Sequence, residues 1–376
     1  IVCPVGDVHA IRCVNLEADH ERATHLTLDS ILTHYNAILD SAISDALIEA
    51  ERNSQRMGRA TLPIYDILRY HLGFKDQHFR DARGDGGKRV RPFLCLLSCT
   101  AAGGAVERAV PMAAAIELLH NFTLIHDDIQ DRSDLRRHRP TVWNLWGTAQ
   151  AINAGDAMFA VAHLALARSQ RAGVDPATVL ALSSMLHQTT LRIVEGQVMD
   201  LGFEDRMDVS VDEYMEMIGG KSAAITRCAC WAGAAVANAD RSATGKLAEF
   251  GFSLGVGFQL QDDVLGTWGA TIETGKPPAD DIVKRKKSLP VLMLLEHADA
   301  IDQERVRSLY SSEELTQHEV QQVLDLLTKY EIRSLARERV REWHDRSQRL
   351  LETAVPPSNA RAELSTLVES LAERTN

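Results

Sequence analysis

The sequence predicts an all-α protein built as a single-domain helical bundle, and three observations support this. From Leu28 onward, apolar residues recur at helical spacing almost throughout the chain of 376 residues. We find no alternating apolar and polar runs typical of strands, and no repeat with a fixed period. Hydrophobic residues make up 45% of the sequence and charged residues 25%, which gives ample apolar material for one core.

The N-terminal residues 1–26 have weak periodicity, and we expect a loosely ordered extension there, followed by a helical domain over 27–376. Asp175 followed by Pro176 is typical of a helix start, because Asp caps free N–H groups and Pro fits the first turn. The expected helices cover residues 28–53, 62–72, 88–102, 105–132, 147–171, 177–199, 221–239, 241–266, 287–298, 312–329, 331–353 and 359–373, with a loop at 133–146.

Two further segments carry local signals. Ser210 to Glu213 reads as a capping box that begins a helix, and Gly219-Gly220 is expected to stop or bend that helix. The connection from Gly266 to Lys287 is rich in Gly, Pro, Lys and Asp and is about 20 residues long, which is unusual inside a compact domain. Such a connection is typical of a functional lid over a site.

Composition excludes several classes of protein. The formal net charge of −11 and the lack of a long basic stripe argue against a nucleic-acid partner. No run of about 18 apolar residues occurs, so we expect no membrane span. The six cysteines form no CxxC pair and have no His partner at zinc spacing, which favours core packing in a reducing compartment and a cytoplasmic location.

Two acidic clusters are the most informative feature of the chain. Asp127, Asp128 and Asp131 end one apolar helical stretch, and Asp262 with Asp263 ends another. Carboxylates beside a buried helix are costly to desolvate unless positive charge lies between them. Because positions i and i+4 share a helix face, Asp127 and Asp131 can present oxygens to one point, a donor set that suits Mg²⁺.

Basic residues flank these clusters. Arg136 and Arg137 follow the first cluster, and the stretch Gly86-Gly-Lys-Arg-Val-Arg-Pro92 precedes it. Lysines also gather in the connection after the second cluster, at Lys276 and at 284–287. Since the net charge of the chain repels anions, local Lys and Arg clusters of this kind predict a site for anionic ligands.

The motifs resemble those of the trans-prenyl diphosphate synthases, all-helical enzymes that extend isoprenoid chains. The resemblance runs from about Leu62 to about Glu296. It rests on six motifs in family order: GGKRVRP, ELLHNFTLIHDDIQD followed by RR, EGQVMDL, Lys221-Ser222, FQLQDDVLG and KRKKSLP. The resemblance implies an isoprenoid synthase fold with a deep central cavity, a homodimer, and three Mg²⁺ ions per site for which Mn²⁺ can substitute.

The resemblance also implies roles for single residues. Asp127, Asp131 and Asp262 are the expected metal ligands, supported by Asp128 and Asp263. Arg136, Lys221 with Ser222, and Lys287 are expected at the allylic diphosphate, with Gln259 beside the metals or the allylic cation. Lys276 is a further candidate, and the register within 284–287 stays open. Lys88, Arg91, His120 and Arg137 match the positions that bind isopentenyl diphosphate without metal, and Gln197 and Asp200 form an expected polar patch reaching the same cavity.

Product length is expected to depend on the helix before the first cluster. With a rise of about 1.5 Å per residue, Phe122 and Thr123 lie one turn below Asp127, and Leu119 lies about two turns below. A large Phe122 beside a small Thr123 resembles the pattern of synthases that make the C20 geranylgeranyl product. The second cluster departs from the family pattern, because Gly266 stands where a third Asp often stands.

Three alternatives stay open. A farnesyl or longer prenyl diphosphate synthase shares the same motifs. A terpene cyclase on the same scaffold would need no isopentenyl diphosphate site, so Lys88, Arg91, His120 and Arg137 argue against it. A non-catalytic partner subunit would be expected to lack acidic motifs, and both are intact here.

Overall fold

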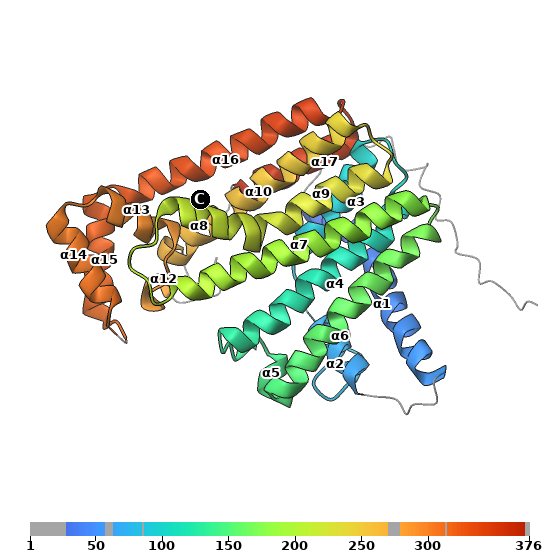
Figure 1. The fold of residues 1–376 in the computed structure, drawn as a ribbon, viewed down its shortest axis with the longest axis horizontal. Coiled ribbons are helices and arrows are strands. Elements are labelled where there is room, and N and C mark those ends of the chain that lie inside the picture. Colours follow the sequence, from blue (N-terminus) through green and yellow to red (C-terminus); the bar gives the residue numbers. More distant parts are fainter. Residues whose placement is uncertain (1–27, 57–62, 85, 270–278, 313, 373–376) are drawn as a thin grey trace, which may run out of the picture.

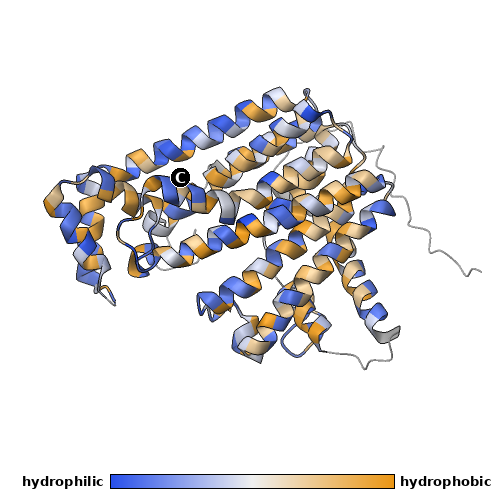
Figure 2. Cartoon of the chain, in the orientation of Figure 1, coloured by the Kyte–Doolittle hydropathy of each residue, from blue (hydrophilic) through white to orange (hydrophobic). Residues whose placement is uncertain are grey.

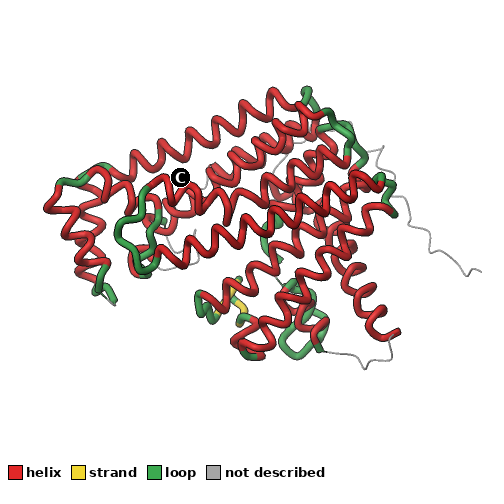
Figure 3. Tube along the Cα trace, viewed as in Figure 1, coloured by secondary structure: helices red, strands yellow, loops and turns green. Residues whose placement is uncertain are grey.

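The computed structural model describes residues 28–56, 63–84, 86–269, 279–312 and 314–372. Within them the chain is almost entirely helical, as the periodicity predicted (Figure 3). The predicted extension at 1–26 and Lys276 lie outside the described residues. None of the described helices combines the length and the apolar character needed to cross a membrane.

The elements, in chain order, are α1 (Leu28–Arg56), α2 (Ile64–His71), α3 (Val90–Ala101), α4 (Val106–Gln130), β1 (Leu135–Arg136), β2 (Arg139–Pro140), α5 (Val142–Trp146), α6 (Thr148–Ala167), η1 (Arg168–Gln170), α7 (Pro176–Phe203), α8 (Val211–Ile218), η2 (Gly219–Ala223), α9 (Ala224–Val236), α10 (Arg241–Trp268), α12 (Asp280–Val283), α13 (Leu289–His297), α14 (Ala300–Tyr310), α15 (Gln317–Lys329), α16 (Ile332–Ala354) and α17 (Asn359–Ala372). Figure 1 shows the long helices α4, α6, α7, α9, α10 and α16 lying side by side, with α14 and α15 at one end.

The helices enclose two apolar cores. The larger core is built chiefly from α1, α3, α4, α6 and α9, and the smaller one from α8, α10, α13, α15 and α16. The two cores meet along α10, which packs against both α9 and α16. In Figure 2, α9 is largely hydrophobic and α16 largely hydrophilic, because α9 is buried on most sides while α16 covers the outside. Burial of apolar area on this scale is the main force that holds the bundle.

The predicted helix starts have a local chemical cause. The side chain of Asp175 accepts a hydrogen bond from the Thr178 backbone N–H at 3.0 Å, and Pro176 occupies the first helical position. Ser210 and Glu213 form the predicted capping box, in which each side chain binds the backbone N–H of the other. Caps of this kind satisfy N–H groups that have no partner within the helix.

The structure differs from the sequence-based expectation in several places, one of which is the short helix α12 inside the expected connection 266–287. The expected loop at 133–146 contains a small hairpin, whose strands β1 and β2 have two residues each, and the short helix α5. Helix α14 was not predicted, because its charged sequence lacks a clear apolar stripe. Gly219-Gly220 does not stop the helix: the chain continues through the π-helical turn η2 into α9. Short π turns often mark functional positions.

Two glycines bring α7 and η2 into backbone contact. A Cβ atom on Gly196 would lie 2.3 Å from the Lys221 backbone nitrogen and 2.7 Å from the Met217 carbonyl oxygen. On the facing side, a Cβ on Gly220 would lie 2.6 Å from the Arg192 carbonyl oxygen. The missing side chains therefore set how closely the two elements approach, and with it the position of Lys221.

We predict that Gly196→Ala lowers the free energy of unfolding by about 2 kcal/mol or more, because backbone atoms cannot move aside as a flexible side chain would. Gly202→Ala is the matched control, since it lies on the same helix and a Cβ there meets nothing within 4 Å. The control should be neutral or stabilising by up to about 1 kcal/mol. Thermal and urea denaturation measure the stability of both variants. Equal stabilities would contradict the close backbone contact between α7 and η2.

Candidate active site

The described residues form two adjoining cavities of opposite character. One has a volume of about 250 Å³ and a basic lining, and we call it the basic compartment. The other, of about 170 Å³, is lined by four carboxylates and three lysines, and we call it the acidic compartment. Ser222 lines both cavities, and its hydroxyl donates a hydrogen bond to Gln259 Oε1 at 2.6 Å. This pair of uncharged side chains forms part of the wall between the compartments.

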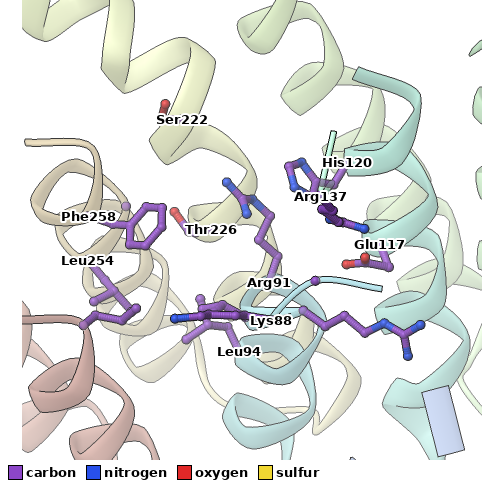
Figure 4. A pocket seen from close by; sticks show the side chains of 15 residues that line it. Lys88, Arg91, Leu94, Glu117, His120, Arg137, Ser222, Thr226, Leu254 and Phe258 are labelled. Carbon is purple, nitrogen blue, oxygen red and sulfur yellow. The ribbon is translucent and has the colours of Figure 1, made fainter. Parts of the chain in front are cut away.

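The basic compartment brings together the residues predicted for isopentenyl diphosphate. Lys88 lies two residues before α3, Arg91 is in the first turn of that helix, His120 is in α4, and Arg137 is in the β1–β2 hairpin. Figure 4 shows the Arg91 side chain in the middle, with His120 and Arg137 on one side of it. On the other side lie three residues of α9 and α10: Thr226, Leu254 and Phe258. The cavity is therefore basic at one end and apolar at the other.

Glu117 is a member of this compartment that the sequence analysis did not single out. Its side chain is buried, and its Oε1 accepts a hydrogen bond from Asn121 Nδ2 at 2.9 Å. Its Oε2 atom is buried without a hydrogen-bond partner. Glu117 lies three residues before His120, on the same face of α4, so helical spacing from His120 could have identified it.

Burial and nearby positive charge both disfavour the charged form of His120. Burial lowers its pKa well below the ordinary value, and the positive charges of Arg91, Arg137 and Arg136 lower it further. Burial also lowers the pKa of Arg91, while the carboxylates of Glu117 and Asp262 oppose that shift. The basic compartment thus gathers positive charge that an anionic ligand would neutralise.

The acidic compartment collects carboxylates from three helices. Asp200 comes from α7, Asp262 and Asp263 from α10, and Asp281 from α12. Lys221 reaches into the same cavity from η2, and its Nζ donates a hydrogen bond to Asp200 Oδ2. Asp281 was not predicted as a site residue, because its sequence position in the connection after the second cluster gives no sign of this contact.

Asp263 is held by protein donors. Its carboxylate accepts hydrogen bonds from the Tyr214 hydroxyl at 2.6 Å, from the Leu289 backbone N–H at 2.9 Å and from Gln259 Nε2 at 3.0 Å. Burial nevertheless raises its pKa to about 6, and the nearby charge of Asp281 adds to that shift. Asp263 therefore links α8, α10 and α13, while Asp262 lines the cavity beside it.

The first acidic cluster lies at the end of α4. Burial raises the pKa of Asp127, and the positive charge of Lys221 opposes this shift. Asp128 is fully buried, and its Oδ1 pairs with Arg136 Nε at 2.7 Å. Burial still raises the pKa of Asp128 to about 6, despite this ion pair. Asp131 is exposed at the C-cap of the helix.

Lys286 is the point at which the two clusters meet. Although partial burial works against its charge, Asp281, Asp200, Asp131 and Asp263 together raise its pKa. The predicted Lys287 is oriented differently: its Nζ donates to the Glu204 carbonyl at 3.0 Å and lies 5.5 Å from the centre of the Tyr310 ring. Burial lowers the pKa of Lys287. Both lysines line the acidic compartment. The sequence left open which residue of 284–287 contacts the diphosphate, and the structure favours Lys286, because its ammonium group lies nearer to the carboxylates.

The donor chemistry of this region fits a divalent cation. Hard carboxylate oxygens suit Mg²⁺. Burial raises the pKa values of Asp127, Asp128 and Asp263, and neighbouring carboxylates add to each shift, so nearby positive charge would stabilise their charged forms. Among the residues that the structure describes, no three His, Cys, Asp or Glu side chains form a ready metal cage. Additional oxygen ligands from water and from a diphosphate would complete the coordination.

The residues predicted to control product length lie below Asp127 on α4. Leu119 is fully buried, and the Thr123 hydroxyl donates to the His120 carbonyl at 2.8 Å. The Phe122 ring lies between two other rings, 4.9 Å from His126 and 5.2 Å from Phe159 of α6. Beside this helix, Gln197 Nε2 donates to Gln130 Oε1 at 2.8 Å, which joins α7 to the end of α4.

Comparison with known proteins agrees with this arrangement. The family model described as polyprenyl synthetase matches residues 76–327. A (2E,6E)-farnesyl diphosphate synthase of Mycobacterium tuberculosis is 39% identical over 268 residues, covering 65% of this chain and 73% of that protein. A geranylgeranyl diphosphate synthase of the same organism is 41% identical over 233 residues, covering 62% of this chain and 65% of that protein.

Solved structures agree with the fold. A polyprenyl synthetase from Streptomyces coelicolor A3(2) is 32% identical and aligns with a TM-score of 0.81. The alignment covers 92% of this chain and 99% of that one. A polyprenyl synthase from Caulobacter crescentus, solved with calcium and isoprenyl diphosphate, is 25% identical, with a TM-score of 0.77 covering 94% and 100% of the two chains. The isoprenoid synthase fold implied by the motifs is therefore confirmed.

Next to the site, His71 at the end of α2 is surrounded by positive charge. Its Nε2 is buried without a hydrogen-bond partner. Burial, together with Arg137, Arg136 and Arg139, lowers its pKa to about 3. A base whose pKa falls on folding binds fewer protons in the folded state than in the unfolded chain. The free energy of unfolding therefore decreases as pH falls below the unfolded value of about 6.5.

We predict that this imidazole costs about 2 kcal/mol of stability between pH 7 and pH 5. His71→Gln should remove that part of the pH dependence, whatever its effect at pH 7. His318→Gln, at an exposed position, is the control and should leave the slope unchanged. Urea denaturation at a series of pH values measures how the free energy of unfolding of each variant depends on pH. Parallel stability curves for the wild type and His71→Gln would show that His71 titrates normally.

Proposed function

Because the chain belongs to the polyprenyl synthetase family, we propose that it condenses isopentenyl diphosphate with an allylic diphosphate to form a short-chain trans-prenyl diphosphate. The observation that carries this proposal is the pairing of a basic compartment with an acidic one, joined through Ser222. A reaction between two diphosphates needs two anion sites. One of them has to stabilise charge that grows on a leaving group, and the other only has to hold its substrate.

The basic compartment is proposed to hold isopentenyl diphosphate directly. Arg91 and Arg137 offer guanidinium forks that suit a diphosphate, and Lys88 adds a point charge. His120, uncharged in the free protein, can donate one N–H, and its pKa would rise once an anion neutralises the nearby arginines. The apolar side formed by Leu254 and Phe258 suits the hydrocarbon part of the substrate.

The acidic compartment is proposed to hold the allylic diphosphate together with Mg²⁺, bound by Asp127, Asp131 and Asp262. Bound Mg²⁺ would act as a Lewis acid that stabilises negative charge on the departing diphosphate. Lys221 and Lys286 neutralise part of the same charge, because both ammonium groups lie among these carboxylates. Arg136 is proposed to contact the diphosphate from the side of Asp128, to which it is bound.

The proposed reaction balances as follows. The allylic carbon–oxygen bond breaks, and its electron pair leaves with the diphosphate. The double bond of isopentenyl diphosphate supplies the pair for the new carbon–carbon bond. A proton is then lost from the former isopentenyl unit to the released diphosphate. Gln259 is held by Ser222 and Asp263 beside this reaction centre, where its amide dipole can face developing positive charge.

We propose a C20 product, geranylgeranyl diphosphate. Its support is Phe122, whose ring is fixed between His126 and Phe159 one turn below Asp127, with the smaller Thr123 beside it. The relatives named above include both a farnesyl and a geranylgeranyl diphosphate synthase, so farnesyl diphosphate is the alternative product. A cyclase is disfavoured, because it would have no use for the basic compartment.

We further propose that the chain forms a homodimer through α6 and α7. Four apolar side chains of α7 lie on one face of that helix and are exposed, as are two of α6: Leu180, Leu191, Val194 and Val198, with Ile152 and Leu164. Spacings of 11, 3 and 4 residues place the four on a single stripe of a 3.6-residue helix. An exposed apolar stripe of this kind is typical of a surface that a second copy covers.

We predict that the purified protein, given Mg²⁺, isopentenyl diphosphate and an allylic primer, releases diphosphate and an extended prenyl diphosphate. Asp262→Asn should lower turnover on the order of 100-fold, because transition-state charge loses its compensation, and EDTA should abolish turnover. The control Asp345→Asn, at an exposed position of α16, should retain full turnover. A cyclic hydrocarbon as product, or no product with any primer length, would refute the proposal.

We predict that Phe122→Ala shifts the product towards longer chains, because the truncation opens space about one isoprene unit below Asp127. Mass spectrometry of the products measures the shift with each primer. Phe252→Ala, whose ring packs against Trp343 on the other side of the bundle, should alter stability without altering product length. Identical product distributions for the wild type and Phe122→Ala would remove Phe122 from length control.

A further inference from the structure

The second acidic motif has a glycine at the position where the first has an aspartate. Gly266 lies one helical turn after Asp262 on the same face of α10, as Asp131 does after Asp127. A Cβ atom on Gly266 would lie 2.0 Å from Asp281 Oδ2 and 2.5 Å from its Cγ. The carboxylate of Asp281 therefore occupies the space that a side chain at position 266 would need.

Asp281 is tied to Lys286 on its other side. The Asp281 side chain is only 8% exposed, and its Oδ1 lies 4.0 Å from Lys286 Nζ. The backbone reinforces this contact, since the Lys286 N–H donates to the Asp281 carbonyl at 2.9 Å. Of the charges that raise the pKa of Lys286, Asp281 is the largest. The neighbouring Asp280 pairs instead with Lys284, at 2.8 Å.

We propose that Asp281 is a positioning residue that holds the Lys286 ammonium in the acidic compartment, and that Gly266 is required because it leaves room for the Asp281 carboxylate. This inference rests on the proposed function, in which Lys286 neutralises part of the charge of the allylic diphosphate. It explains the departure of the second motif from the family pattern. A carboxylate is present next to position 266, but it is supplied by α12 and acts through a lysine.

The physical reason is the freedom of the lysine side chain. Lys286 is 54% exposed, and an exposed lysine on a four-carbon stem samples many rotamers. Ordering it only when the diphosphate binds would weaken binding. The buried carboxylate of Asp281 beside it restricts the ammonium before the ligand arrives, at a point where the charges of Asp131, Asp200 and Asp263 also act on it.

The test measures the binding of inorganic diphosphate in the presence of Mg²⁺ by calorimetry, together with KM for each substrate. Gly266→Ala changes no charged group, but its methyl displaces the Asp281 carboxylate. We expect diphosphate to bind about tenfold more weakly to Gly266→Ala and to Asp281→Asn. KM for the allylic substrate should rise in parallel, while KM for isopentenyl diphosphate stays within about twofold. Gly245→Ala, where a Cβ on the same helix meets nothing within 4 Å, should behave as the wild type.

Double variants show whether the effect passes through Lys286. Asp281→Asn should have no further effect on diphosphate binding in a Lys286→Ala background, and Gly266→Ala should add nothing to Asp281→Asn. If Gly266→Ala does not fold, Asp281→Asn is compared with Asp280→Asn, which should bind diphosphate normally. Wild-type affinity in Asp281→Asn, or effects that multiply in the double variants, would overturn the inference.

The two proposals fail separately. A wild-type protein that binds diphosphate with Mg²⁺ but extends no primer would refute the proposed condensation, and the variants would still report on Lys286. A wild-type protein that extends primers, with Gly266→Ala and Asp281→Asn both indistinguishable from it in allylic KM, would refute only the positioning role.

Discussion

Carboxylates from α4, α7, α10 and α12 converge on one partly buried region, and their mutual repulsion is what the surrounding structure has to offset. Two like charges about 4 Å apart near a protein surface repel by roughly 4 kcal/mol. Burial raises the pKa values of Asp127, Asp128 and Asp263, and the charges of neighbouring carboxylates raise them further. Lys221 and Lys286 supply part of the missing positive charge, and the remainder is the electrostatic basis for binding divalent cations.

The basic compartment has the opposite imbalance, and the two regions lie side by side. Asp262 favours the charged form of Arg91 across their common wall, so each compartment offsets part of the cost of the other. Ser222 and Gln259, which are uncharged, are hydrogen-bonded to each other in the wall between the two sides. This separation preserves two distinct anion sites, and a condensation between two diphosphates depends on having both.

Sequence reasoning predicted the helices because apolar periodicity and caps such as Asp175 and Ser210 are local signals. It also identified most of the charged residues that line the two compartments, because each belongs to a short motif. It could not predict contacts that depend on the tertiary fold. The approach of Asp281 to Gly266 joins two elements that the sequence does not show to be neighbours, and the choice between Lys286 and Lys287 depends on the turn after α12. The π turn η2 lies where Gly220 approaches α7, a contact that no helical pattern reveals.

Positions that break local rules concentrate around the two compartments. Arg89 and Arg137 adopt left-handed backbone conformations, with φ of 48° and 51°, which are unfavourable for residues with a side chain. Gly196 and Gly220 each weaken a helix by up to about 1 kcal/mol relative to Ala. Each of these costs is tied to one placement: the two arginines direct basic segments into one cavity, and the two glycines let η2 approach α7 so that Lys221 reaches Asp200. Since apolar packing elsewhere in the two cores has to offset these costs, stability is exchanged here for the geometry of the site.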